Sequence, residues 1–92
     1  MKTVSIVGFG RFGKTLYKLI KDDFNIIIYD HKKVELSNLG NIKIAKHIAD
    51  VYKAEVIFYA VPIAAFEEVI VSHKKYFQKH HLLEGFYLLY SQ

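Results

Sequence analysis

Three glycines with fixed spacing near the start of the chain constrain its fold more than any other feature. An apolar run, Val4 to Val7, leads into Gly8-Phe9-Gly10-Arg11-Phe12-Gly13, and the following residues have the spacing of an amphipathic helix. A second apolar run, Ile26 to Tyr29, ends at Asp30. A strand, a glycine turn, a helix and a second strand ending in an acid are typical of a dinucleotide-binding β-α-β unit. We therefore predict that this stretch holds a dinucleotide.

Each glycine has its own role in this prediction. Gly8 permits the tight turn out of the first strand, Gly10 lets a pyrophosphate approach the backbone, and Gly13 lets the helix pack closely on the strand. The amides at the start of the helix point toward the phosphates, where the helix dipole favours negative charge. Arg11 can add a charged contact there. The predicted cofactor-binding residues of this segment are Gly8, Phe9, Gly10, Arg11, Phe12 and Gly13.

The acid that ends the second strand bears on the choice of nucleotide. Asp30 follows Gly8 by 22 residues, close to the ~20-residue spacing at which an acid binds the ribose hydroxyls of NAD. Its carboxylate would repel the 2′-phosphate of NADP, whereas His31, Lys32 and Lys33 could accept that phosphate. We predict NAD in preference to NADP. His31 either touches the adenine side of the cofactor or lies exposed in the loop.

Alternation of strands and helices predicts the fold. Strands are expected at residues 3–7, 25–29, 42–45, 55–60 and 86–90, and helices at 11–22, 47–53 and 63–79, with one helical turn at 34–39. This order predicts an α/β, Rossmann-like fold, in which a mainly parallel five-stranded sheet of order 3-2-1-4-5 carries helices on both faces. Residues 1–92 are expected to form a single dinucleotide-binding domain. The first helix should face the sheet with Phe12, Leu16, Leu19 and Ile20.

Composition excludes several other classes. Apolar residues make up 52% of the chain and cysteine is absent, which favours a packed core and excludes disulfides and thiolate zinc sites. Neither a signal-peptide pattern nor an apolar run near the ~18 residues of a membrane span occurs, so we expect a cytoplasmic protein without a membrane partner. The net charge of +4 comes from dispersed lysines with a single arginine, Arg11, which argues against nucleic-acid binding.

In several of these motifs the chain resembles the NAD-binding domain of prephenate and arogenate dehydrogenases. The resemblance lies in Val7 to Lys14, in Tyr29-Asp30, and in Ala60-Val61-Pro62-Ile63 followed by Phe66 to Val69. It implies an NAD-dependent oxidoreductase of tyrosine biosynthesis. It also places Gly8, Gly10, Arg11, Phe12 and Asp30 at cofactor positions, and the loop Ala60, Val61 and Pro62 beside the cofactor.

The resemblance has a limit. The family continues from its fifth strand into a catalytic segment and a helical domain, whereas here Phe86 to Tyr90 is followed only by Ser91-Gln92. We therefore expect no catalytic residue in this chain, which would not be catalytically complete alone. Two alternatives stay open: a nucleotide-sensing module like the regulatory domains of potassium channels, or a folded remnant without activity.

Several histidines and one tyrosine could in principle form a metal site or contact the cofactor, but the sequence favours structural roles for them. His73, His80 and His81 lack a carboxylate that would complete a metal site, so no metal is predicted. Tyr59 could approach a nicotinamide, but an aromatic residue in a buried strand is more often part of the core. The last strand would leave an apolar edge unpaired. We therefore expect a homodimer, formed through that edge or by domain swapping.

Overall fold

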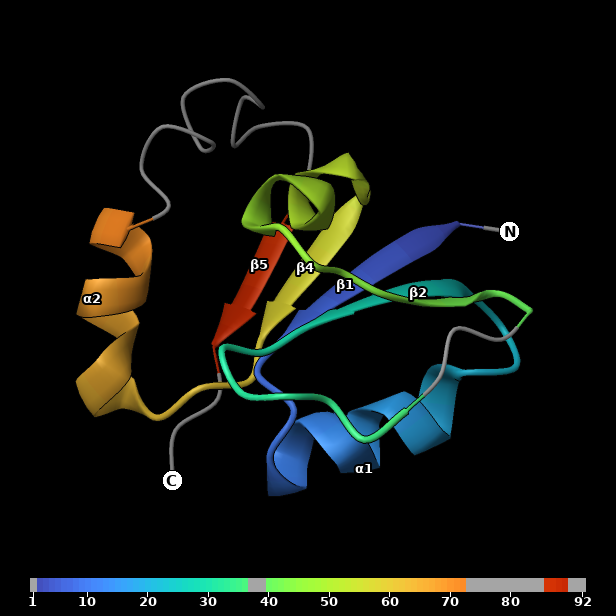
Figure 1. The fold of residues 1–92 in the computed structure, drawn as a ribbon, viewed down its shortest axis with the longest axis horizontal. Coiled ribbons are helices and arrows are strands. Elements are labelled where there is room, and N and C mark those ends of the chain that lie inside the picture. Colours follow the sequence, from blue (N-terminus) through green and yellow to red (C-terminus); the bar gives the residue numbers. More distant parts are fainter. Residues whose placement is uncertain (1, 37–39, 73–85, 90–92) are drawn as a thin grey trace.

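The computed structural model describes residues 2–36, 40–72 and 86–89 of the chain. Its elements follow the predicted alternation of strands and helices (Figure 1). In chain order they are β1 (Thr3–Val7), α1 (Arg11–Ile20), β2 (Asn25–Tyr29), β3 (Ile42–Ile44), the 3-10 helix η1 (Ile48–Lys53), β4 (Val56–Tyr59), α2 (Ile63–Ser72) and β5 (Phe86–Leu89).

The described strands form one parallel sheet whose register aligns three strand ends. The order is β3-β2-β1-β4-β5, so the predicted order of the first four strands is confirmed. Val7 at the end of β1 lies opposite Tyr29 at the end of β2 and opposite Tyr59 at the end of β4. The last residues of the three strands are therefore in register, and the loops that follow them begin at the same edge of the sheet.

The two faces of the sheet carry separate core clusters. Ile6, Ile26 and Ile28 are fully buried on the face that α1 covers, where Leu16 and other helix residues pack against them. The opposite face holds a second buried cluster, covered by η1 and by Val69 of α2; its buried members are Val7, Val51, Tyr52, Ile57 and Tyr59. Helices on both faces, as predicted, follow from continuous apolar runs that bury both sides of each central strand.

Two polar contacts inside the second cluster join η1 to the sheet. The buried Ser5 hydroxyl donates a hydrogen bond to the Val51 carbonyl oxygen at 2.7 Å. The hydroxyls of Tyr52 and Tyr59 share a buried hydrogen bond of 2.7 Å. Buried polar groups need such partners because an unsatisfied group costs about 1–3 kcal/mol. Tyr59 is therefore a core residue, as the simpler interpretation held.

Several predicted boundaries and faces were wrong. The first helix ends at Ile20 instead of Asp22, and Leu19 is 73% exposed, while Tyr17 packs against the sheet in its place. The expected helical turn at 34–39 is absent over its described part, residues 34–36. Val34 and Leu36 both pack on the Ile6 cluster there, on either side of a bend at Glu35.

The C-terminal part is described only in pieces. α2 begins directly after Pro62, as predicted, and its described part ends at Ser72, so residues 73–79 of the expected helix lie outside the described residues. β5 pairs with β4 in parallel from Phe86 opposite Val56 to Leu89 opposite Tyr59. No helix among the described residues is long and apolar enough to cross a membrane.

Candidate dinucleotide site

The turn after β1 requires glycine at two positions for steric reasons. Gly8 has a φ of +99°, a conformation that side-chain-bearing residues rarely adopt, and a Cβ there would lie 2.5 Å from the Ala60 carbonyl oxygen. A Cβ on Gly13 would collide with the carbonyl of Gly8. α1 therefore packs directly against the turn, and the turn against the loop after β4. This is the close packing that the glycine spacing predicts.

Gly10 differs from both, since a Cβ there would meet no atom within 4 Å. It is the N-cap of α1 and offers no side-chain cap, and the first turn contains no acidic residue. The uncapped start of a helix exposes backbone N–H groups and favours an anion. The space in front of Gly10 is therefore open to a phosphate that a methyl group would obstruct.

Asp30 is held against this turn by its own hydrogen bonds. One carboxylate oxygen accepts a 2.7 Å hydrogen bond from the backbone N–H of Phe9, and the other accepts one of 3.0 Å from the N–H of Lys32. The Nδ1 atom of His31 lies 3.1 Å from the second oxygen. The Asp30 side chain is only 15% exposed, whereas that of His31 is 83% exposed. These contacts fix a carboxylate at the mouth of the glycine turn.

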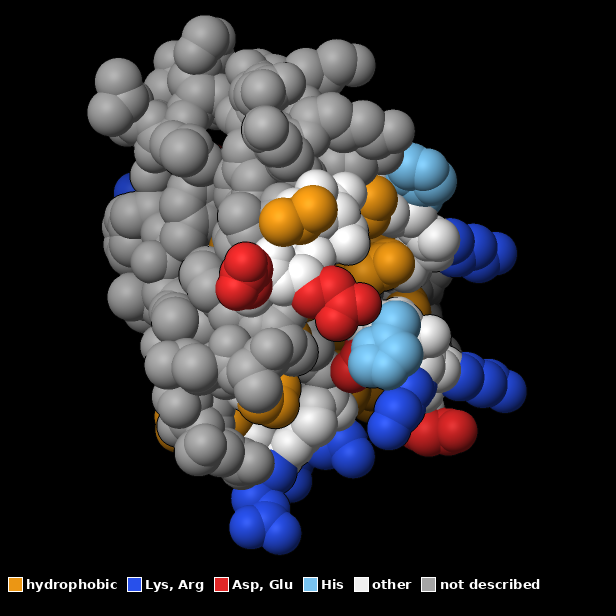
Figure 2. Space-filling model, turned by 90° about the vertical axis from the view of Figure 1, so that its left-hand side faces the viewer, with side chains coloured by type: hydrophobic (Ala, Val, Ile, Leu, Met, Phe, Trp, Pro, Cys, Tyr) orange, Lys and Arg blue, Asp and Glu red, His pale blue; other side chains and the backbone are white. Residues whose placement is uncertain are grey.

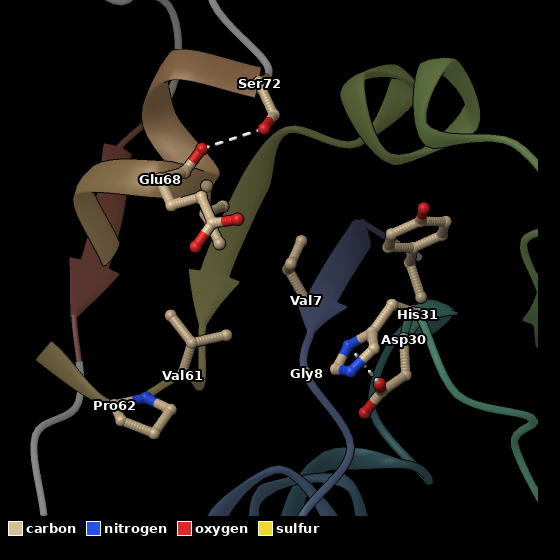
Figure 3. A pocket seen from close by; sticks show the side chains of 10 residues that line it. Val7, Gly8, Asp30, His31, Val61, Pro62, Glu68 and Ser72 are labelled. Carbon is tan, nitrogen blue, oxygen red and sulfur yellow. Dashed lines mark hydrogen bonds and ion pairs between the residues drawn. The ribbon is translucent and has the colours of Figure 1, made fainter. Parts of the chain in front are cut away.

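A cavity of about 520 Å³ opens beside this carboxylate. Figure 3 shows its two walls, one at the ends of β1 and β2 and the other on the loop after β4 and on α2. The first wall comprises Val7, Gly8, Tyr29, Asp30 and His31. The second comprises Val61, Pro62, Glu68, Val69 and Ser72. Its volume lies within the range of about 300–1,000 Å³ that is typical of small-molecule sites.

A second cavity, of about 400 Å³, adjoins the first at Asp30. It shares Tyr29, Asp30 and His31 with the first, and reaches the end of β3. Its remaining lining includes Lys32, Lys33 and Lys46, all of them exposed. Figure 2 shows basic side chains close to a histidine and acidic groups on one face of the molecule. Asp30 thus lines both cavities, of which the first also contains Glu68 and the second contains three lysines.

The predicted site residues divide into two groups. Five of them line the first cavity, namely Gly8, Asp30, His31, Val61 and Pro62. Phe9 instead packs on the Ile6 cluster and against the ring of Tyr17, with ring centroids 5.7 Å apart. Arg11 is exposed on the first turn of α1. The remaining four, Gly10, Phe12, Gly13 and Ala60, belong to the turn or border it without lining the cavity.

Sequence reasoning missed the polar part of the second wall. Glu68 and Ser72 are four residues apart and therefore lie on one face of α2, which is the signal that could have identified them. Their position beside the cavity depends on how α2 crosses the sheet, which the sequence does not state. No group of three His, Cys, Asp or Glu side chains that could hold a metal occurs among the described residues. His73, His80 and His81 lie outside them.

The chain is similar to known oxidoreductases in sequence and in fold. The family model of NADP oxidoreductases, coenzyme F420-dependent, matches residues 3–83. A solved structure of D-2-hydroxyisocaproate dehydrogenase is similar, with a TM-score of 0.58 and 26% sequence identity, over 68% of this chain and 19% of that one. This chain thus spans 19% of that structure's length. No curated protein matches the chain significantly.

These comparisons confirm the prediction of an oxidoreductase-type Rossmann domain that binds a pyridine nucleotide. The assignment to prephenate dehydrogenases stays a prediction. The glycine turn, the level strand ends and the parallel sheet agree with the family match, which extends over most of the sequence. The chain therefore belongs to the family of NADP oxidoreductases, coenzyme F420-dependent, as a Rossmann-like domain of the pyridine-nucleotide oxidoreductase type.

Proposed function

We propose that this chain binds NAD at the carboxyl edge of its sheet and serves as the cofactor-holding part of an NAD-dependent dehydrogenase. One observation carries the proposal: the register of three strands brings Gly8, Asp30 and Ala60 to the same edge. A ligand in that position meets a phosphate-accepting turn and a fixed carboxylate together. Parallel α/β sheets bind ligands at this edge, where the strand order reverses.

The residues present fit a dinucleotide. Open space in front of Gly10 suits the pyrophosphate, and the uncapped start of α1 supplies N–H donors for it. Asp30 would accept hydrogen bonds from the hydroxyls of the adenosine ribose, since two backbone N–H groups already hold the carboxylate in place. The adjoining cavity would take the base that this ribose carries. Bound there, the cofactor supplies hydride transfer, and this chain's residues bind and orient it.

The choice of NAD over NADP rests on Asp30. A carboxylate that is 15% exposed and fixed at the ribose position disfavours a 2′-phosphate, because the two negative charges would be brought together. The opposing observation is the second cavity, where Lys32, Lys33 and Lys46 could neutralise such a phosphate. The family description also names NADP. We infer NAD as the preferred ligand and NADP as its competitor.

The substrate is proposed from sequence resemblance. Gly8 to Gly13, with Ala60-Val61-Pro62 after β4, resembles prephenate and arogenate dehydrogenases. In such an enzyme the hydride would pass to the nicotinamide from a substrate held by a further domain. We therefore infer a role in prephenate oxidation in which this chain holds the cofactor, and we assign no catalytic residue to it.

Calorimetric titration of the purified chain with NAD and with NADP tests the cofactor proposal. We expect NAD to bind and NADP to bind more weakly. Asp30→Ala should weaken NAD binding by at least tenfold, equivalent to about 1.4 kcal/mol, and narrow the difference between the two nucleotides. Asp22→Ala is the matched control, because the Asp22 side chain is 85% exposed and does not line the cavity. Absence of binding by both nucleotides at millimolar concentration would contradict the proposal.

A further inference from the structure

α2 forms part of one wall of the first cavity, and two polar side chains lie on it. The proposed binding of the ribose and of the pyrophosphate uses neither side chain. Glu68 and Ser72 line the cavity opposite Asp30 and His31. Figure 3 shows the Glu68 carboxylate extending from α2 into the space above Val61. Within the described part of the chain, Glu68 has no ion-pair partner that would account for its position.

Both side chains present hydrogen-bond acceptors. An ionised carboxylate has no proton to donate. The Ser72 hydroxyl donates its only proton to the backbone carbonyl of Glu68, at 2.9 Å, so its oxygen offers lone pairs to the cavity. A ligand group that fits this wall must therefore be a hydrogen-bond donor. Val61 and Val69 beside it provide an apolar surface for a flat ring.

The base of the proposed cofactor meets these requirements. If Asp30 binds the adenosine ribose, the adenine joined to that ribose lies one glycosidic bond away and enters the same cavity. Adenine carries an exocyclic 6-amino group with two N–H donors, and its ring faces suit the flanking valines. His31, 83% exposed on the opposite wall, can cover the other face of the ring.

We propose that Glu68 recognises the 6-amino group of the adenine and makes the site selective for adenine over 6-oxopurines. This inference rests on the proposed NAD binding and adds the determinant of base selectivity. In hypoxanthine a carbonyl oxygen replaces the amino group. That oxygen would face the carboxylate of Glu68, and no hydrogen bond could form because both groups are acceptors. A ligand that leaves the polar groups of a binding site without hydrogen-bond partners binds more weakly, so the site discriminates against it.

The test compares NAD with nicotinamide hypoxanthine dinucleotide by calorimetry on the intact chain. We expect NAD to bind about tenfold more tightly, as the loss of one charge-assisted hydrogen bond implies. Glu68→Gln should reduce this ratio to within about twofold, because an amide offers both a donor and an acceptor. Glu67→Gln is the matched control: Glu67 is exposed on the same helix but does not line the cavity, so the ratio should stay unchanged.

The outcomes separate this inference from the function on which it rests. Equal binding of the two dinucleotides by the unaltered chain, or an unchanged ratio in Glu68→Gln, would overturn the role of Glu68 while leaving NAD binding in place. Failure of both dinucleotides to bind would overturn the proposed function and the selectivity together. Glu68 is exposed, so its substitution by glutamine should not prevent folding.

Discussion

At the scale of single residues, the three glycines of the turn are alike in sequence but differ in what surrounds them. Gly8 and Gly13 are required by packing, because a Cβ on either would meet backbone oxygen. No packing contact among the described residues requires glycine at position 10, since a Cβ there would meet no atom within 4 Å. The sequence spacing predicted all three, but only the three-dimensional structure distinguishes the two that packing requires from the one that borders open space.

Gly8→Ala should therefore destabilise the fold. The substitution places a methyl group 2.5 Å from the Ala60 carbonyl oxygen and forces alanine into a φ of +99°. We expect a loss of about 2–4 kcal/mol in the free energy of unfolding, measured by urea denaturation followed by circular dichroism. A loss below about 0.5 kcal/mol would show that the turn can rearrange.

Gly10→Ala is the matched variant with the opposite expectation. Its methyl group enters empty space, so the free energy of unfolding should change by less than about 1 kcal/mol. NAD affinity should nonetheless fall by at least about tenfold, because the methyl group occupies the space proposed for the pyrophosphate. Unchanged NAD affinity in a stable Gly10→Ala protein would place the phosphates elsewhere.

At the scale of elements, a buried hydroxyl of β1 is one of the two polar contacts that join η1 to the sheet. Ser5 is fully buried in β1 and its hydroxyl reaches the Val51 carbonyl at 2.7 Å. Ser5→Ala should cost about 1–2 kcal/mol in the free energy of unfolding, since the bond is lost in a dry environment. Thr15→Ala is the control: its hydroxyl bonds the Arg11 carbonyl on an exposed helix surface. It should stay within about 0.5 kcal/mol of the parent. Equal effects of the two changes would contradict the anchoring role of Ser5.

The same 3-10 helix contains a carboxylate with a shifted pKa. A hydrogen bond from the Lys53 ammonium, 3.0 Å away, holds the pKa of Asp50 below its ordinary value of 3.8. Because the folded pKa is the lower one, the pair stabilises the fold above the unfolded pKa, and this contribution disappears as the pH falls through the folded pKa. An NMR titration of the Asp50 carboxyl should show this low midpoint and its return toward 3.8 in Lys53→Ala. An unchanged midpoint in that variant would contradict the pairing.

The elements also show how far the sequence determined the outcome. Continuous apolar runs ending at Gly8, Asp30 and Ala60 were sufficient to predict β1, β2 and β4, because such runs mark buried parallel strands. Leu19 was misplaced because Tyr17 offered a competing apolar position on the same helix. Glu68 was missed because its approach to the cavity depends on the path of α2 across the sheet, a long-range property that local patterns do not encode.

At the scale of the whole molecule, the edge of the sheet leads to a prediction about assembly. β5 is the outermost described strand on the side of β4. A strand in that position presents unpaired backbone groups that a second copy can pair with. The homodimer expected from the sequence thus stays a prediction, and sedimentation velocity at tens of micromolar should detect it. A single monomeric species at that concentration would contradict it.

The central claim is that one edge of the sheet, where β1, β2 and β4 end level, binds the dinucleotide. Titrating the ¹⁵N-labelled protein with NAD and following the backbone amide signals tests it most directly. We predict the largest shifts at Gly10, Arg11 and His31, with Lys43 in β3 unaffected. The absence of shifts at millimolar NAD, or shifts confined to residues away from the glycine turn and Asp30, would contradict the account.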